Sequence, residues 1–194
     1  HRHQPSCLRH WTQNRYALLR RLWQALCIIR DSFMLIDNKL ANVFLSKYKT
    51  VLSSINSGIQ PDTNNEYVYL RSQAFDNINK IEKNAINAVG HEFIESIKSG
   101  IYGKFVYLKK YQNGYILQNI ETGKYYQVAA LTTPLEELTS EYSIIETAII
   151  PFANQLICDG LIIHQGIHIG KNMQKEIRNG YWQAKRSGEL IINA

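Results

Sequence analysis

The chain contains little cysteine and no long hydrophobic run. Its three cysteines, Cys7, Cys27 and Cys158, are odd in number and far apart, which excludes a disulfide framework and a CxxC metal-binding knuckle. No stretch approaches about 18 uninterrupted apolar residues, so the sequence predicts no transmembrane helix. The 194 residues are 45% hydrophobic and 20% charged, which is typical of a globular protein with a core of its own. By default, these features predict a protein of the reducing cytoplasm.

Acidic residues are missing from the first 30 positions. That segment holds six arginines and no lysine, so it accounts for the whole net charge of +6. The rest of the chain is neutral, because 16 of the 22 basic residues and all 16 acidic residues lie there. The change in composition predicts an Arg-rich helical segment over 1–33, whose origin differs from that of the rest, as upstream coding sequence or a fused neighbour would. A helical region over 34–99 and an antiparallel β domain with a terminal helix over 100–194 are predicted to follow.

Apolar residues recur at helical spacing in the N-terminal half. This spacing predicts one or two amphipathic helices from residue 8 to about residue 48. A loop is predicted over 56–65, where turn-forming residues gather. Further helix is predicted over 67–99, with a break near Gly90 and a stop at Gly100.

The period of the apolar residues changes from 3.6 to 2 in the C-terminal half, which is typical of strands. The Asn113-Gly114 pair predicts a type I′ hairpin turn, in which both central residues have positive φ. Gly123 predicts a second short turn, so that three strands form an antiparallel meander. The predicted strands are 104–111, 115–120 and 124–131.

Two nearly continuous apolar runs follow, over 143–152 and 155–164, and they predict strands buried on both faces. Asp159-Gly160 inside the second run predicts a bulge or a tight turn. Residues 170–187 predict a closing helix. The sequence therefore predicts an α+β fold, with a helical N-terminal half followed by a mainly antiparallel β-sheet or small barrel and a C-terminal helix.

Four short motifs follow one another in the C-terminal half: a TxPLEE-like turn, a PF pair, an IxDGL segment and a YxxAK helix. They are Thr133–Glu137, Pro151-Phe152, Ile157–Leu161 and Tyr181–Lys185. In this pattern the chain resembles a family of uncharacterised bacterial proteins, and it departs from the family at Cys158, where the family has an aromatic residue. The resemblance implies a bacterial cytoplasmic protein. It implies no activity, so it assigns no catalytic residue.

Histidine and glycine patterns give little sign of a metal or nucleotide site. His164 and His168 are four residues apart, but in a strand that spacing spans about 13 Å, too far for one ion. The segment 166–172 is one residue short of a phosphate-binding loop and lacks the hydroxyl that holds magnesium. We therefore predict no metal and no cofactor. A weaker hypothesis is an anion site at Gly170 and Lys171, where a helix begins, and the alternative is an ordinary strand–helix junction.

No arrangement of nucleophile and base is evident, so we predict no catalytic residue. Cys158 lies in an apolar run, where an inert thiol is expected. Asp159 is an acidic residue in the same run, so its carboxylate must be hydrogen-bonded or lie in a turn. A structural Asp-Gly turn is the favoured interpretation. The alternative is a small hydrolytic or regulatory enzyme with a cleft around Asp159 and His164.

The closing helix carries the clearest candidate for a binding surface. At about 100° per residue, Met173, Ile177, Tyr181 and Ala184 share one face. The opposite face is basic, with one aromatic residue, and its members are Lys171, Lys175, Arg178, Trp182, Lys185 and Arg186. Such a stripe suits a phosphate backbone with a stacked base, a protein contact through Trp182, or a solvated surface. We predict a non-catalytic binding domain for nucleic acid or protein. The oligomeric state is left open.

Overall fold

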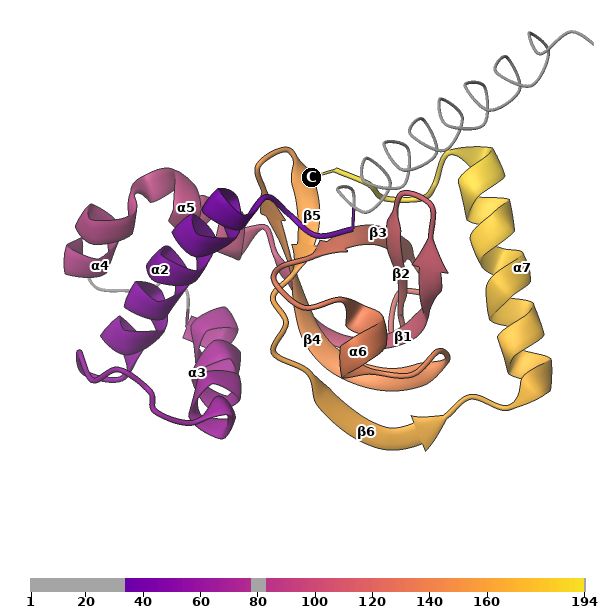
Figure 1. The fold of residues 1–194 in the computed structure, drawn as a ribbon, viewed down its shortest axis with the longest axis horizontal. Coiled ribbons are helices and arrows are strands. Elements are labelled where there is room, and N and C mark those ends of the chain that lie inside the picture. The colour runs from indigo at the N-terminus through magenta and orange to yellow at the C-terminus, as the bar shows by residue number, and fades with distance from the viewer. Residues whose placement is uncertain (1–33, 78–82, 194) are drawn as a thin grey trace, which may run out of the picture.

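The computed structural model describes residues 34–77 and 83–193 of the chain. The Arg-rich helix predicted within residues 1–33 lies outside these ranges. Over the described residues the fold is α+β, as predicted: helices form the N-terminal half, a β-barrel follows, and a long helix lies near the C-terminus (Figure 1). The chain passes from helix to strand between Lys98 and Ile101, next to the predicted stop at Gly100.

Among the described residues, four helices precede the barrel and lie together on one side of it (Figure 1). They are α2 (Asn38–Ile55), α3 (Asn64–Asn77), α4 (Lys83–Val89) and α5 (His91–Lys98). Asp37 caps α2, because its carboxylate accepts hydrogen bonds from the backbone N–H groups of Lys39 and Leu40. The predicted break near Gly90 is confirmed, since this residue has a φ of +89° and separates α4 from α5.

Five strands form a closed barrel. They are β1 (Ile101–Tyr111), β2 (Gly114–Asn119), β3 (Tyr125–Ala130), β4 (Ser143–Phe152) and β5 (Gln155–Cys158). The predicted antiparallel meander is confirmed as β1-β2-β3. The order around the barrel is β1-β2-β3-β5-β4, and β4 pairs with β1 to close it. All pairs are antiparallel except β3–β5, and this Greek-key strand order is that of the OB-fold.

The second predicted apolar run is divided by a tight turn. β5 ends at Cys158, Gly160 has a φ of +78°, and a separate strand, β6 (Ile163–His168), follows. Of the described strands, β6 pairs with β4 alone, outside the barrel, where His164 lies opposite Ile145. The described part of the chain holds two more helices, the single turn α6 (Leu135–Leu138) between β3 and β4, and the closing helix α7 (Lys171–Ser187).

The first hairpin turn lies one residue earlier than predicted, and its predicted type is wrong. The central residues are Gln112 and Asn113, and neither has a positive φ, so the turn is not of type I′. Gly114 does have a positive φ, +143°, at the start of β2. A Cβ atom there would lie 2.8 Å from the carbonyl oxygen of Val128, so the close approach of β3 requires the glycine.

Apolar side chains form three clusters around the barrel wall. One fills the interior and includes Phe105 and Leu117. A second lies between helices α2–α5 and the outer side of β3, β4 and β5, where Phe44 and Ile157 are fully buried. The third lies between α7 and the outer side of β1–β3, and it includes Ile116. The barrel interior is therefore packed, and helices cover two of its outer sides.

Candidate functional site

Helix α7 forms where the sequence predicts it, and both of its ends have a local cause. It begins after Gly170, the N-cap residue, which offers no side chain to the first turn. It ends at Gly188, whose φ of +77° allows the N–H groups of Glu189 and Leu190 to bond the carbonyl oxygen of Ala184. The helix lies on the far side of the barrel from α2–α5 (Figure 1).

The inner face of α7 packs closely on the outer side of the meander. Ile177, Tyr181 and Ala184 are buried there, as the predicted apolar face required. The Tyr125 hydroxyl donates a hydrogen bond of 2.9 Å to the carbonyl oxygen of Ile177. A Cβ atom at Gly180 would collide with that hydroxyl, so the glycine sets the distance between α7 and β3.

One member of the predicted apolar face does not belong to it. Met173 is 54% exposed, whereas Ile177, one turn later, is buried. The helical period places the two residues on the same side, but Met173 lies in the first turn, before α7 reaches its first buried contact with the meander. The helical period alone cannot show where along its length the helix meets the barrel.

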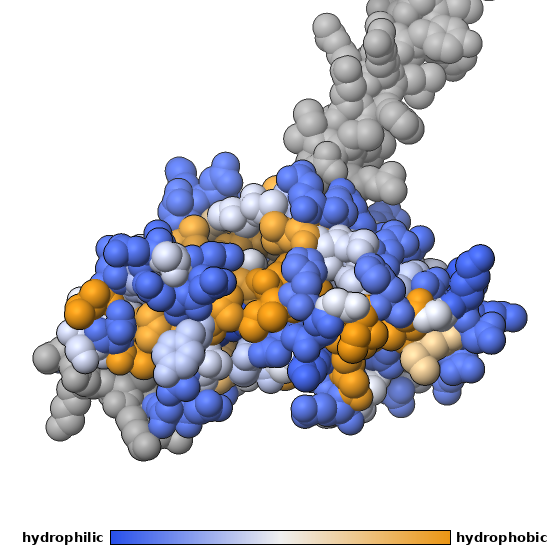
Figure 2. Space-filling model, turned by 90° about the horizontal axis from the view of Figure 1, so that it is seen from below, coloured by the Kyte–Doolittle hydropathy of each residue, from blue (hydrophilic) through white to orange (hydrophobic). Residues whose placement is uncertain are grey.

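The outer face of α7 is exposed, and it carries all six residues that the sequence singled out for binding. They are Lys171, Lys175, Arg178, Trp182, Lys185 and Arg186. The four ion pairs found within 34–77 and 83–193 join other side chains, so no carboxylate in those ranges holds these five cations. Figure 2 views the molecule from below Figure 1, and its right-hand end, where α7 lies, is mainly hydrophilic.

Trp182 is 39% exposed and lies in an aromatic cluster that sequence reasoning missed. Its ring meets Tyr111, at the end of β1, edge-on with centroids 5.8 Å apart and planes at 88°. Tyr181 contacts both rings, at centroid distances of 5.0 Å from Trp182 and 4.6 Å from Tyr111. The pairing of Tyr111 with Trp182 crosses 71 residues of sequence, so no local pattern reveals it.

Two lysines lie over the rings of this cluster. The Lys185 Nζ lies 5.3 Å from the Trp182 ring centroid, and the Lys109 Nζ lies 5.4 Å from that of Tyr111. Burial raises the pKa of the Tyr111 hydroxyl to about 12, while the nearby Arg178 guanidinium acts in the opposite direction. The tyrosine is therefore neutral at physiological pH. The cluster thus combines neutral rings with cationic side chains.

Tyr142 packs against the apolar cluster between α7 and β1–β3, and it has a backbone conformation that is rare for a bulky residue. Its φ is +60°. Two backbone hydrogen bonds hold it there, because its N–H donates to the carbonyl oxygen of Tyr107 at 2.6 Å and its own carbonyl accepts from Ile169 at 3.0 Å. The residue ties β1, the start of β4 and the segment leading into α7 together.

The predicted anion site at Gly170 and Lys171 is exposed at the start of α7. The Gly170 carbonyl accepts a hydrogen bond from the Gln174 N–H, and the Gln174 side chain donates to the Ile169 carbonyl oxygen at 2.7 Å. The N-cap residue makes no side-chain hydrogen bond to the N–H groups of the first turn. These contacts fit a strand–helix junction, and the anion site stays a prediction.

Asp159 is buried at the junction between the helices and the barrel. Its Oδ1 accepts hydrogen bonds from Thr147 Oγ1 at 3.0 Å and from the Leu161 N–H at 3.1 Å. Its Oδ2 accepts one from the Tyr48 hydroxyl at 3.3 Å and lies 3.4 Å from Nη1 of Arg71, in an ion pair with no exposed side-chain surface. The carboxylate therefore links α2 and α3 to β4 and the turn after β5.

The ionisation of this pair follows from its surroundings. Burial raises the pKa of the Asp159 carboxyl, and the Arg71 guanidinium together with the Thr147 and backbone donors acts in the opposite direction. Burial acts to lower the pKa of Arg71, but Asp159 raises it, and the net shift is upward. The carboxylate accepts hydrogen bonds from Tyr48, Arg71, Thr147 and the Leu161 N–H, and these donors favour the ionised form of the pair.

Asp159 and His164 are not hydrogen-bonded to each other, and they differ in solvent exposure. Asp159 is 5% exposed and its oxygens are occupied as described, whereas His164 is exposed on β6. Within the described residues, no group of three or more His, Cys, Asp or Glu side chains is placed to hold a metal ion. This placement favours the structural role for Asp159.

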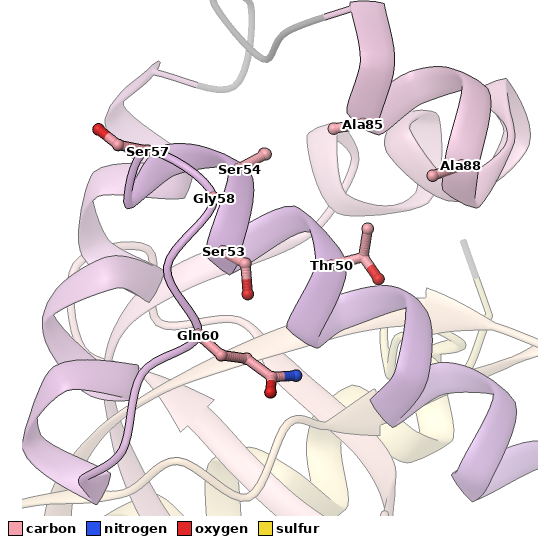
Figure 3. Close-up of a pocket in the computed structure, with 8 residues that line it drawn as sticks. All are labelled: Thr50, Ser53, Ser54, Ser57, Gly58, Gln60, Ala85 and Ala88. Atoms are coloured by element: carbon pink, nitrogen blue, oxygen red, sulfur yellow. The ribbon is translucent and has the colours of Figure 1, made fainter.

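A groove of about 670 Å³ lies between the end of α2 and α4 (Figure 3). Apart from Gln60, its walls are small or hydroxyl-bearing residues, and Ala85 and Ala88 of α4 lie across from the end of α2. The Thr50 and Ser54 hydroxyls donate to carbonyl oxygens of their own helix, at 3.0 and 2.7 Å. The groove offers no charged side chain among those lining residues, so we assign no chemistry to it.

Comparisons with known proteins give no match. No protein-family model matches the chain, no curated protein matches it, and no solved structure matches it. The likeness to the OB-fold is therefore one of strand order alone, and the resemblance to uncharacterised bacterial proteins stays a prediction. Among the described helices, none has the length and apolar character needed to cross a membrane.

Proposed function

We propose that this chain is a non-catalytic nucleic-acid-binding domain that contacts phosphates through the outer face of α7. The observation that carries the proposal is the exposure of all five predicted cations on one face of a single helix, with no carboxylate pairing them in the described ranges. A row of unpaired Lys and Arg side chains matches the charge of a phosphate backbone.

The dimensions of the stripe support this match. Lys171 and Arg186 are 15 residues apart, which is about 22 Å along a helix. One strand of B-form DNA presents a phosphate about every 3.4 Å of axis, so the stripe lies beside about six of them. Glu176 is the one acidic residue within α7. The chain beyond residue 30 has no net charge, so the excess of cations on this helix is a local feature that acidic residues elsewhere in the chain offset.

The strand order of the barrel would suggest a different binding surface, formed by β2 and β3. In OB-fold proteins the face of strands 2 and 3 binds oligonucleotides. Here that face carries Ile116 and Tyr125, which are buried under Ile177 and Tyr181 of α7. Fold analogy is therefore a weak guide. The proposal rests on the side chains of α7 and not on the barrel.

The proposal is tested by measuring the affinity of the full chain for single- and double-stranded DNA and RNA over a range of salt concentrations. Lys175→Ala and Arg178→Ala should each weaken binding similarly for all sequences and lower the salt slope by about one. Lys39→Ala is the matched control, because Lys39 is exposed on α2 at the other side of the barrel. If no binding appears at micromolar protein, the proposal is overturned, and the stripe is a solvated surface or a protein contact through Trp182.

We also propose a bacterial, cytoplasmic setting. It is supported by the motif pattern of the C-terminal half and by Cys158, which is a free, buried thiol. Recovery of the motif series in order from bacterial proteins without export signals would bear this out, and its recovery mainly from exported proteins would overturn it.

A further inference from the structure

The aromatic cluster beside the basic stripe bears on which nucleic acid binds. We propose that Trp182 and Tyr111 form a stacking corner for an unpaired base, so that the ligand is a single strand and not a duplex. This inference rests on the proposed function, because the α7 cations supply the phosphate contacts. It adds a site on β1 that lies outside the helix.

The geometry of the corner fits a flat ligand. The two ring planes meet at 88° with centroids 5.8 Å apart, so a base that lies on the indole has the edge of Tyr111 beside it. Tyr181 is 1% exposed and packs against both rings. The buried support restrains both rings before a ligand arrives, which reduces the conformational entropy lost on binding.

Two lysines near the stacking corner can contact either the aromatic rings or the phosphates of a bound nucleic-acid strand. Lys185 lies over the indole and Lys109 over the Tyr111 ring. A contact between a lysine and an exposed ring is weak, so a base can replace the ammonium on the ring face. The displaced lysine then reaches the phosphate of the same nucleotide. Stacking on aromatic rings inside a positively charged groove is the common mode of single-strand binding.

A duplex cannot use the corner in the same way. Its bases are stacked on one another, and only their edges face the grooves. Phosphate contacts along α7 are open to single strands and duplexes alike, whereas ring contacts require a base outside a stack. The aromatic residues therefore set the preference for single strands, and the cations set the general affinity.

The experiment compares a fluorescein-labelled single strand of deoxythymidine, about 12 nucleotides long, with a labelled duplex of equal length, by fluorescence anisotropy of the full chain. Wild type should bind the single strand more tightly. Trp182→Leu and Tyr111→Leu should each weaken single-strand binding by about 5- to 150-fold and leave duplex binding unchanged. Trp182→Tyr, which keeps a ring, should restore most of the single-strand affinity.

Met173→Leu is the matched control, because Met173 is also an exposed large apolar side chain of α7 but lies off the basic stripe. Circular dichroism spectra and thermal midpoints of all variants show whether the fold persists. An unchanged affinity for the duplex shows that the basic face of α7 is intact in the ring variants. Equal binding of single strand and duplex, with no effect of the ring variants, would overturn the stacking corner while Lys175→Ala still reports the proposed function. Absence of binding to both ligands would overturn both.

Discussion

The buried ion pair between Arg71 and Asp159 allows the sharpest test of how the helices are joined to the barrel. Arg71→Met removes the cation and keeps a long apolar side chain in its place. The carboxylate of Asp159 then stays buried without a counter-charge, and we expect the free energy of unfolding to fall by about 3–5 kcal/mol. The pair is fully buried, so solvent screening does not reduce this figure.

A second substitution, at Asp159, should restore part of the stability that Arg71→Met removes. In the Arg71→Met background, Asp159→Asn removes the stranded charge. The amide oxygen can still accept from Thr147 and the Leu161 N–H, and the amide nitrogen can donate to the Tyr48 hydroxyl. We therefore expect the double variant to be more stable than Arg71→Met alone, by more than about 1 kcal/mol.

The assay is urea unfolding of the full chain, followed by far-ultraviolet circular dichroism, with the m-values compared to check two-state behaviour. Lys110→Met is the control, since it breaks the exposed ion pair with Glu136, at 2.9 Å, and should cost about 0–1 kcal/mol. If Arg71→Met costs no more than this control, or if Asp159→Asn lowers the stability of the Arg71→Met variant further, the buried pair does not join helices and barrel as argued.

The pH dependence of Arg71→Met follows from the same pair. In the native chain, Arg71 opposes the rise that burial causes in the pKa of Asp159. Without the guanidinium, the folded-state pKa rises further above the unfolded value of about 4. A carboxyl with a raised folded-state pKa contributes stability that is present below the unfolded pKa and is lost as pH rises. The deficit of Arg71→Met relative to wild type should therefore shrink as the pH falls toward 4, and a deficit that grows on acidification would contradict the assignment.

Three further predictions concern single residues. Gly114→Ala should lower the free energy of unfolding by more than about 1 kcal/mol, because its Cβ would lie 2.8 Å from a carbonyl oxygen at a φ of +143°; a neutral result in urea unfolding would contradict this packing. Gly180→Ala should also destabilise, against the helix propensity of alanine, and less so in a Tyr125→Phe background that lacks the colliding hydroxyl; equal costs in both backgrounds would mean that the hydroxyl is not the obstacle. Burial raises the pKa of the Cys158 thiol to about 11, so iodoacetamide at pH 8 should label it only after unfolding, as peptide mapping would show; rapid labelling of the folded chain would place it at the surface.

Local patterns in the sequence predicted burial well where apolar residues repeat at a fixed period, with Met173 as the exception on α7. The strand 143–152 has the predicted ends, and Ile177, Tyr181 and Ala184 lie on the predicted inner face of α7. The period fixes which side of an element is buried, whatever it packs against. For the same reason the exposed positions of the six candidate binding residues followed from the helical wheel.

Contacts between distant segments could not be predicted in this way. Arg71 and Asp159 are 88 residues apart, and the parallel pairing of β3 with β5 depends on how the barrel closes. The hairpin turn was misjudged because the Asn-Gly pair is a local signal, whereas Gly114 meets a requirement set by β3. The positive-φ pair expected there occurs instead at Ala153-Asn154, between β4 and β5.

The way the barrel is covered limits where this protein can bind a large ligand. The interior is filled by side chains such as Phe105 and Leu117, helices α2–α5 lie on the outer side of β3–β5, and α7 lies on that of β1–β3. A ligand of β2 and β3 would first have to displace Tyr181, which is 1% exposed. The polar outer face of α7 is available without any such rearrangement. If α7 only covered the apolar outer side of β1–β3, its exposed face would need no excess of one charge. Covering the barrel therefore does not explain why α7 carries five cations and one acidic residue.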